Sequence, residues 1–178
     1  MACSQTLNGF YQIDCSPSKG GVKEIYIANY DDVTGVTYNS ASTIVTGISM
    51  ASGATFKKYT MRRNTASMTS NLTIDETAGV NYVATDVLIR FNKLDTPQRI
   101  EMSALTLAET RVIVLDANGK YWFLGLNEPV VPSSGTAQSG QQKTDGSYYE
   151  LTLQSSDDTW PIEVTADAVA AVEYNPGS

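Results

Sequence analysis

The chain has 178 residues, 42% of them hydrophobic, which suits one globular domain with its own core and excludes a disordered chain. Its net charge of −7 and pI near 4.5 exclude a general nucleic-acid-binding protein, which needs a basic surface to meet phosphate. It contains no histidine, so the commonest general base and the commonest metal ligand are both missing.

The N-terminal residues are rich in Ser, Gly and Asn, and we expect residues 1–23 to form a loosely held arm with one short strand at residues 10–13. They lack the basic and apolar regions of a signal peptide, and no later run approaches the roughly eighteen apolar residues of a membrane helix. We therefore expect no membrane partner, and we expect Cys3 and Cys15 to be free thiols in a reducing cytoplasm.

Residues 22–30, VKEIYIANY, alternate along the chain as a strand does, and Asp31-Asp32 then marks a turn. Residues 33–55 are small, polar and β-branched, a composition that favours weak strands joined by flexible turns. Because few bulky side chains occur here, we expect this part to depend on neighbouring chains for its order.

The longest pattern covers residues 56–94, which we interpret as two antiparallel strands, Phe56–Ile74 and Val80–Leu94. Residues 75–79 connect them, and Gly79 supplies the positive φ that a hairpin needs. In the first strand the apolar side chains change from odd to even numbers near residues 62–64, which predicts a bulge or bend. Since these strands exceed the usual length of about five or six residues, the tip should stand in solvent or pack against another chain.

The residues Asp95-Thr96-Pro97-Gln98 supply a helix cap, a first-turn proline and a glutamine three positions after the cap. They predict a helix that ends near residues 105–108. One face of this helix is apolar and is expected to meet the core; it carries Ile100, Ala104, Leu107 and Ala108. Met102 and Leu105 lie off that face and indicate a second contact surface.

Residues 110–115 and 120–125 form a second predicted hairpin, because the Asn118-Gly119 turn between them is a strong hairpin signal. Residues 126–146 are expected to be a long loop, and residues 147–154 an alternating strand. A further strand is predicted from Trp160 to Thr165. Residues 166–172 suit a strand or a short helix, and we favour the strand.

This order of elements is typical of a mainly β protein, namely a two-sheet β-sandwich or partly open barrel with one flanking α-helix and a long protruding hairpin. We expect a single domain over residues 1–178. Its N-terminal arm and weak strands occupy residues 1–55, and its β core occupies residues 56–174.

Motifs that carry chemistry are missing. The sequence has no phosphate-binding loop, no dinucleotide-binding glycine pattern and no cysteine pairs at zinc spacing, and a serine nucleophile would lack a histidine partner. The acidic pairs at residues 31–32, 75–76 and 157–158 fall in predicted turns, where aspartate bonds the local backbone, so we expect surface turns and not a metal or glycosidase site. The expectation is a protein that is not an enzyme and has no catalytic residue, cofactor or metal.

One basic cluster lies in the first strand of the long predicted hairpin. This cluster either meets the acidic surface of a neighbouring subunit or is a solvated strand end whose lysines protect an edge, and the sequence favours neither. Together with apolar residues of the hairpin it supplies the candidate inter-subunit contacts, which are Lys57, Lys58, Arg62, Arg63, Met68, Leu72, Val83, Val87, Ile89 and Phe91.

Residues 56–125 and 143–167 resemble the tail-tube and neck-ring virion proteins of tailed bacteriophages, and most of all those of crAss-like and related phages of gut Bacteroidales. The segments that carry the resemblance are FKKYTMRRNTASMTSNLTID, GVNYVATDVLIRF, RIEMSAL, VLDANGKYWFLG and TDGSYYELTLQ. The resemblance implies a β-sandwich or barrel with one flanking helix that assembles into homo-oligomeric rings, six-fold in a tube or twelve-fold in a collar.

In such rings a long hairpin from each subunit joins its neighbours and lines a channel, through which DNA passes without specific binding. The resemblance thus implies a structural protein of the virion tail or neck, assembled in the host cytoplasm with other tail or neck proteins. The arm and the 126–146 loop would bridge successive rings. The alternative function is a carbohydrate-binding adhesin that uses the rings of Tyr121, Trp122, Tyr148 and Tyr149.

Overall fold

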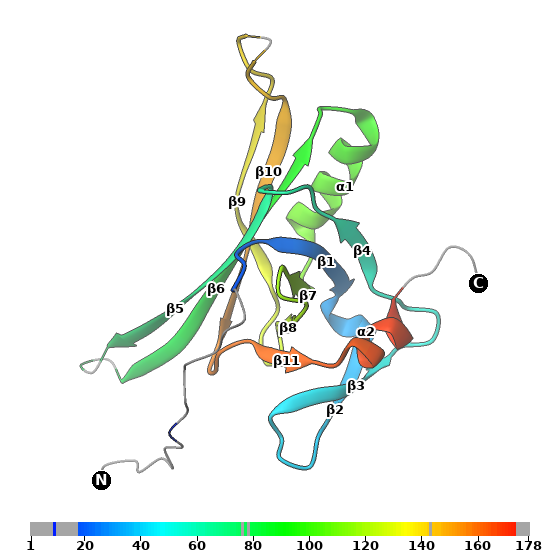
Figure 1. The fold of residues 1–178 in the computed structure, drawn as a ribbon, viewed down its shortest axis with the longest axis vertical. Coiled ribbons are helices and arrows are strands. Elements are labelled where there is room, and N and C mark those ends of the chain that lie inside the picture. The colour runs from blue at the N-terminus through cyan, green and yellow to red at the C-terminus, as the bar shows by residue number, and fades with distance from the viewer. Residues whose placement is uncertain (1–8, 10–17, 76, 78, 143, 174–178) are drawn as a thin grey trace.

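The computed structural model describes residue 9 and residues 18–75, 77, 79–142 and 144–173, which form two β-sheets and two α-helices (Figure 1). The seven-stranded sheet has the order β2 (Val33–Tyr38), β3 (Ile44–Met50), β11 (Ile162–Val164), β8 (Tyr121–Leu124), β7 (Thr110–Asp116), β1 (Val22–Asn29) and β4 (Lys57–Thr60). The four-stranded sheet has the order β5 (Ala66–Asp75), β6 (Val80–Asn92), β10 (Tyr148–Asp157) and β9 (Val131–Gln138). Helix α1 spans Thr96–Leu107, helix α2 spans Ala166–Val172, and a 3-10 turn spans Tyr30–Asp32.

The predicted fold class, a mainly β sandwich with a flanking helix and a long hairpin, is confirmed. Gly79 has the predicted positive φ, 67°, and Gly119, in the other predicted hairpin turn, has a φ of 86°. The expected strand at residues 10–13 and the two cysteines lie outside the described residues.

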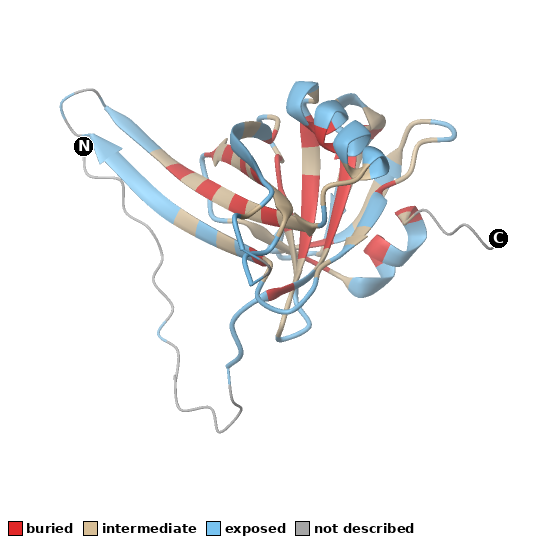
Figure 2. Cartoon of the chain, turned by 90° about the horizontal axis from the view of Figure 1, so that it is seen from above, coloured by how far each residue is buried: buried red, intermediate tan, exposed pale blue. Residues whose placement is uncertain are grey.

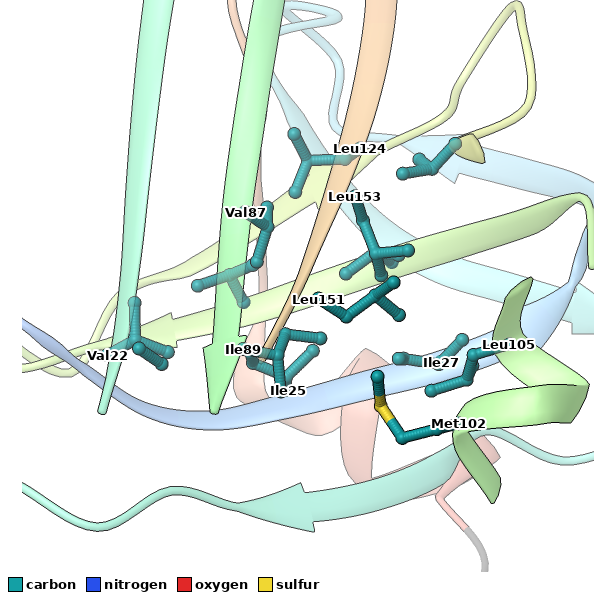
Figure 3. Packing of buried hydrophobic residues seen from close by; sticks show 14 residues of the cluster. Val22, Ile25, Ile27, Val87, Ile89, Met102, Leu105, Leu124, Leu151 and Leu153 are labelled. Carbon is teal, nitrogen blue, oxygen red and sulfur yellow. The ribbon is translucent and has the colours of Figure 1, made fainter. Parts of the chain in front are cut away.

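Apolar side chains cover both faces of the seven-stranded sheet, since successive residues of a strand point to opposite faces. The first core lies between the sheets and joins β1 and β7 to β6 and β10; Figure 3 shows Ile25, Ile27, Val87, Ile89, Leu151 and Leu153 meeting there. The second core lies on the other face and includes Tyr26, Phe56, Ile113, Phe123, Val169 and Val172. Strand β1, from the N-terminal third of the chain, therefore contributes to both cores.

Helix α1 begins where the sequence predicts, with the Asp95 carboxylate accepting the Gln98 N–H at 3.1 Å, but it faces the core differently. Met102 and Leu105 point into the first core (Figure 3), whereas Ile100 is 56% and Leu107 is 90% exposed. The predicted core face was therefore wrong. Polar contacts account for the rotation: Glu101 accepts the Tyr59 hydroxyl, and the Gln98 amide donates to the Asn92 carbonyl at 3.4 Å.

Residues 166–172 form a helix, so the favoured strand was wrong and the fold has a second flanking helix. The Thr165 hydroxyl accepts the Ala168 N–H at 3.4 Å and caps the helix. Four of its seven residues are alanines, the residue with the highest helix propensity. One apolar face, made by Ala168, Val169 and Val172, closes the second core.

The predicted long strand Phe56–Ile74 is two strands in two different sheets, so the single continuous strand was wrong, although the chain does bend where a bulge or bend was predicted. Strand β4 pairs with β1 in the seven-stranded sheet, and β5 pairs with β6 in the four-stranded sheet. The chain crosses between the sheets at residues 61–65, where Asn64 takes a φ of 63°. The change from odd to even apolar positions thus marks the crossing from one sheet to the other.

Two further expectations are corrected in the C-terminal half. The loop predicted at residues 126–146 contains β9, which pairs with β10 along most of its length. Asp157 is not in a surface turn; it ends β10 and is 9% exposed. Its carboxylate accepts the N–H groups of Gly125 and Asn127, each at 3.2 Å, and so fixes the chain after β8.

Candidate assembly surface

The four-stranded sheet ends in β5 on one side and β9 on the other, and no strand among the described residues pairs with the outer side of either. Each of its three strand pairs is antiparallel, so the directions alternate and β5 and β9 run oppositely. A second copy of the sheet, set beside the first in the same orientation, would therefore bring its β5 against this β9 as one more antiparallel pair.

Backbone hydrogen bonds show which groups point outward from the β5 edge. The Arg90 N–H donates to the Thr65 carbonyl at 3.0 Å, and the register from Ala66 to Asp75 continues without a shift. In an antiparallel ladder every second residue bonds to the partner strand, so the odd-numbered residues of β5 bond to β6. The N–H and C=O groups of the even-numbered residues then face outward.

The same reasoning applies to the β9 edge. The Lys93 N–H donates to the Ser147 carbonyl at 2.7 Å, so the odd-numbered residues of β10 bond to β6 and the even-numbered ones to β9. Their direct partners on β9 include Ser134, Thr136 and Gln138. The backbone groups of Gly135 and Ala137, between them, face outward.

The two edges carry few of the features that usually protect a free edge, such as lysines, prolines or bulges. Strand β5 contains one charged residue, Asp75, at its end, and no proline. Strand β9 contains no charged residue, and its one proline, Pro132, and its register shift lie near its start. Edges of this kind are typical of strands that pair with another chain.

The hairpin of β5 and β6 extends beyond the rest of the sandwich, and Figure 2 shows its burial falling toward the tip. Near that tip, large apolar side chains meet solvent: Leu72 is 47%, Ile74 59% and Val80 40% exposed. Leu72 and Ile74 share the face of β5 that carries Ala66 into the first core. The tip therefore continues the apolar face of the sheet without a cover from the part of the chain that the structure describes.

An open groove lies at the opposite edge of the sheet, between α1 and β9. It has a volume of about 490 Å³. Its floor is the apolar face of the sheet, and its lining includes Met102, Pro132, Gly135, Ala137, Tyr149 and Leu151. Gly135 leaves room for about one methyl group in this floor. A Cβ added there would lie 3.5 Å from Leu151, which is an ordinary van der Waals distance.

The other face of the four-stranded sheet is mostly polar, with Val80, Ala84 and Leu88 of β6 as apolar exceptions, and we call it the polar face. It carries the odd-numbered residues of β5 and the even-numbered residues of β6 and β10, all half-exposed or exposed. Pairs of directly opposite side chains bond across it: Arg90 with Glu150, and Gln154 with Asp86 at 2.8 Å.

Arg90 supplies the one cationic side chain of the four strands. Its Nε and Nη2 both donate to Glu150 Oε2, at 2.9 and 2.7 Å, and its guanidinium lies 4.0 Å from the centre of the Tyr148 ring. Asp75 and Asp86 add further negative charge on the same face. A phosphate approaching this face therefore finds its one cation already bonded to a carboxylate.

The basic cluster predicted from the sequence lies away from the polar face. Lys58, on β4, bonds Glu24 and Glu173 of its own chain, each at 3.2 Å. Burial alone would lower the Lys58 pKa, but hydrogen bonds and charge from both carboxylates outweigh it and raise the pKa. Lys57 also has partners, including the Thr55 hydroxyl at 3.3 Å. Arg62 and Arg63 are exposed where the chain crosses between the sheets.

The apolar candidate contacts fall into three groups. Val83, Val87 and Ile89 are 0–2% exposed in the chain's own core, so they stabilise the fold and offer no surface to a neighbour. Met68 and Phe91 are half-buried against the same core. Leu72 is the member of the apolar set that stands exposed at an edge. The neighbouring exposed residues Ile74 and Val80 were missed, because only the length of the strands indicated an exposed tip.

The aromatic residues of the adhesin alternative do not form one group. Tyr121 and Trp122 lie on β8 in the seven-stranded sheet, where the Trp122 indole donates to Asp116 at 3.2 Å. Tyr148 and Tyr149 lie at the start of β10 in the other sheet. Tyr148 stacks with Arg90 on the polar face, and Tyr149 lines the groove on the apolar face.

Searches for a metal site, for a membrane span and for similar proteins point to no other functional site in the described residues. The described part of the chain holds no group of three or more side chains suited to a metal ion. None of its described helices is long and apolar enough to span a bilayer. No family model, no curated protein and no solved structure matches the sequence or its fold.

Proposed function

We propose that this chain is the subunit of a homo-oligomeric ring or tube in the tail or neck of a bacteriophage virion, where it forms a conduit for DNA. It has no catalytic role. The observation that supports this function best is the four-stranded sheet, which combines two edges of opposite direction, unpaired among the described residues, with one apolar and one polar face. Side-by-side pairing of such sheets gives a closed ring with no edge left free.

Closure would place the polar face toward the lumen, because the opposite face is covered by the rest of the sandwich. A six-fold ring would contain four strands from each copy. At a strand spacing of about 4.8 Å and a tilt of about 36°, such a barrel measures about 45 Å across between backbones, and a twelve-fold ring about 90 Å. Either opening admits a DNA duplex.

The chemistry of the polar face suits passage of DNA without binding. Nonspecific affinity for DNA comes mainly from cations that displace counterions at phosphates. On this face Arg90 is neutralised by Glu150, while the carboxylates of Asp75 and Asp86 repel phosphate. A lumen of this kind would let DNA slide.

The mass of the purified protein tests the assembly step. Light scattering over a concentration series is expected to give a species six or twelve times the 19.2 kDa chain mass, or larger stacks of it. A chain that stays monomeric at every concentration and binds glycans saturably would contradict the ring and favour the adhesin.

Removing the carboxylate that pairs with Arg90 tests whether the polar face lines the lumen. Glu150→Gln rings are expected to bind a short DNA duplex at 50 mM salt and to lose about a thousandfold in affinity by 200 mM, as about six phosphate contacts require. Wild-type rings are expected to bind none. Binding is measured by fluorescence anisotropy of the labelled duplex at both salt concentrations.

Glu163→Gln is the matched control, because it removes the same charge and frees Lys120 on the seven-stranded sheet instead. The lumen assignment predicts a much weaker effect there. Equal DNA binding by both variants would contradict it, since overall charge and not the polar face would then govern binding.

A further inference from the structure

We propose a specific contact between neighbouring copies: β5 of one copy pairs with β9 of the next at a stagger of four residues, and its Leu72 enters the groove beside α1. This inference rests on the ring proposed above and adds the register and the occupant of the groove. The occupant is the hairpin of a second copy, because the exposed apolar face of β5 and the groove floor belong to the two edges of one sheet.

The two faces of the sheet restrict the stagger to even numbers. A shift by one residue would turn the apolar side chains of β5 onto the polar face of its neighbour. It would also set outward backbone groups against inward ones, since even-numbered residues of β5 and odd-numbered residues of β9 carry the free groups. Even staggers remain, such as zero, two, four and six residues.

Barrel geometry selects among these values. Ala66, Ile89, Leu151 and Gly135 are successive direct partners and so lie in one row across the sheet. A barrel whose strands tilt by about 36° is staggered by about one residue per strand, hence about four residues for each four-stranded copy. Ser70 of the neighbour, four residues beyond Ala66, then stands beside Gly135, and the whole length of β9 is paired.

In this register Leu72 of the neighbour lies opposite Ser133 and next to Pro132, at one end of the groove. Its side chain, now 47% exposed, would leave water and fill part of the space over the floor. Gly135, which has no side chain, lies opposite the small side chain of Ser70, so the two strands can approach each other there. The polar face is continued in turn, with Thr69 of the neighbour beside Thr136.

Disulfide cross-linking between cysteine pairs introduced on the polar face determines the register directly. In a background with Cys3→Ser and Cys15→Ser, Thr69→Cys is combined with Ser134→Cys, Thr136→Cys or Gln138→Cys. These three pairs come into contact at staggers of two, four and six residues respectively. Within one chain β5 and β9 are three strand spacings apart, about 14 Å, so no pair can close a bridge inside a copy.

After assembly and mild oxidation, the Thr69→Cys, Thr136→Cys variant is expected to give a ladder of covalent oligomers on a non-reducing gel, at least tenfold more than the other two pairs. Thr69→Cys alone is expected to give none. A stronger ladder from Ser134→Cys or Gln138→Cys, or rings without a ladder from any pair, would overturn the register while leaving the ring intact. Failure of the cysteine-free background to assemble would overturn the ring itself and the inference with it.

Discussion

Leu72→Pro is expected to leave the chain folded and to abolish ring assembly. Leu72 is an even-numbered residue of β5, so its N–H points away from β6 and a proline there removes no hydrogen bond within the chain. At the interface it removes a donor and leaves a carbonyl of the neighbour unpaired, and a buried unpaired group costs about 1–3 kcal/mol. Together with the lost apolar contact, each interface should weaken at least about a hundredfold.

Leu72→Thr is the control, because threonine keeps the N–H and favours the strand conformation. It should assemble at about tenfold higher concentration than the wild type, through loss of the apolar contact alone. Light scattering gives the assembly state, and circular dichroism with urea unfolding shows that both monomers are folded. Normal rings from the proline variant would mean that the β5 edge takes no part in assembly.

The second large effect is on stability. Asp157→Ala is expected to lower the free energy of unfolding by about 1–3 kcal/mol, because the buried N–H of Gly125 and the part-buried N–H of Asn127 lose their acceptor. No other residue type replaces Gly125 easily there, since its φ is 83° and an added Cβ would lie 2.9 Å from Val130. The chain after β8 therefore has little freedom to find a new partner for these groups.

Urea unfolding of the monomer measures this effect. Asp158→Ala, at the exposed neighbouring position, is the control and should change the free energy of unfolding by less than about 0.5 kcal/mol. Equal losses from the two variants would contradict a special role for the Asp157 carboxylate. Asp157→Asn should fall between them, since one amide oxygen can still accept a hydrogen bond.

The sequence predicts most of the fold because its strongest signals are local. The Asp95 cap, the glycines at 79 and 119 and the alternation along β6 and β10 act within a few residues, and the structure has each of them. The alanines and the Thr165 cap of α2 were a signal of the same kind, and they should have outweighed the β-branched valines in our prediction.

The features missed are those that depend on distant parts of the chain. Strand β9 shows no alternation, because nearly all of its residues are exposed at an edge, and only pairing with β10 makes it a strand. The orientation of α1 depends on Tyr59 and Asn92, which bond its polar residues. The crossing after β4 needs the second sheet to be known before the parity change can be interpreted.

The candidate assembly surface also has one part that the sequence predicts and another part that depends on the tertiary structure. The length of the hairpin pointed to a tip outside the chain's own core, and Leu72 was among the predicted contacts. The groove beside α1 and the free edge of β9 came only with the tertiary structure, since both arise where residues 96–107, 131–138 and 148–157 meet.

Negative-stain microscopy of the assembled protein tests the ring most directly. We expect rings or stacked tubes with a central hole, whose wall follows a barrel about 45 Å across for six-fold and about 90 Å for twelve-fold symmetry. The Leu72→Pro variant, imaged at the same concentration, should show separate particles of monomer size. Compact particles without a hole, formed equally by the wild type and by Leu72→Pro, would contradict assembly through the edges of the four-stranded sheet.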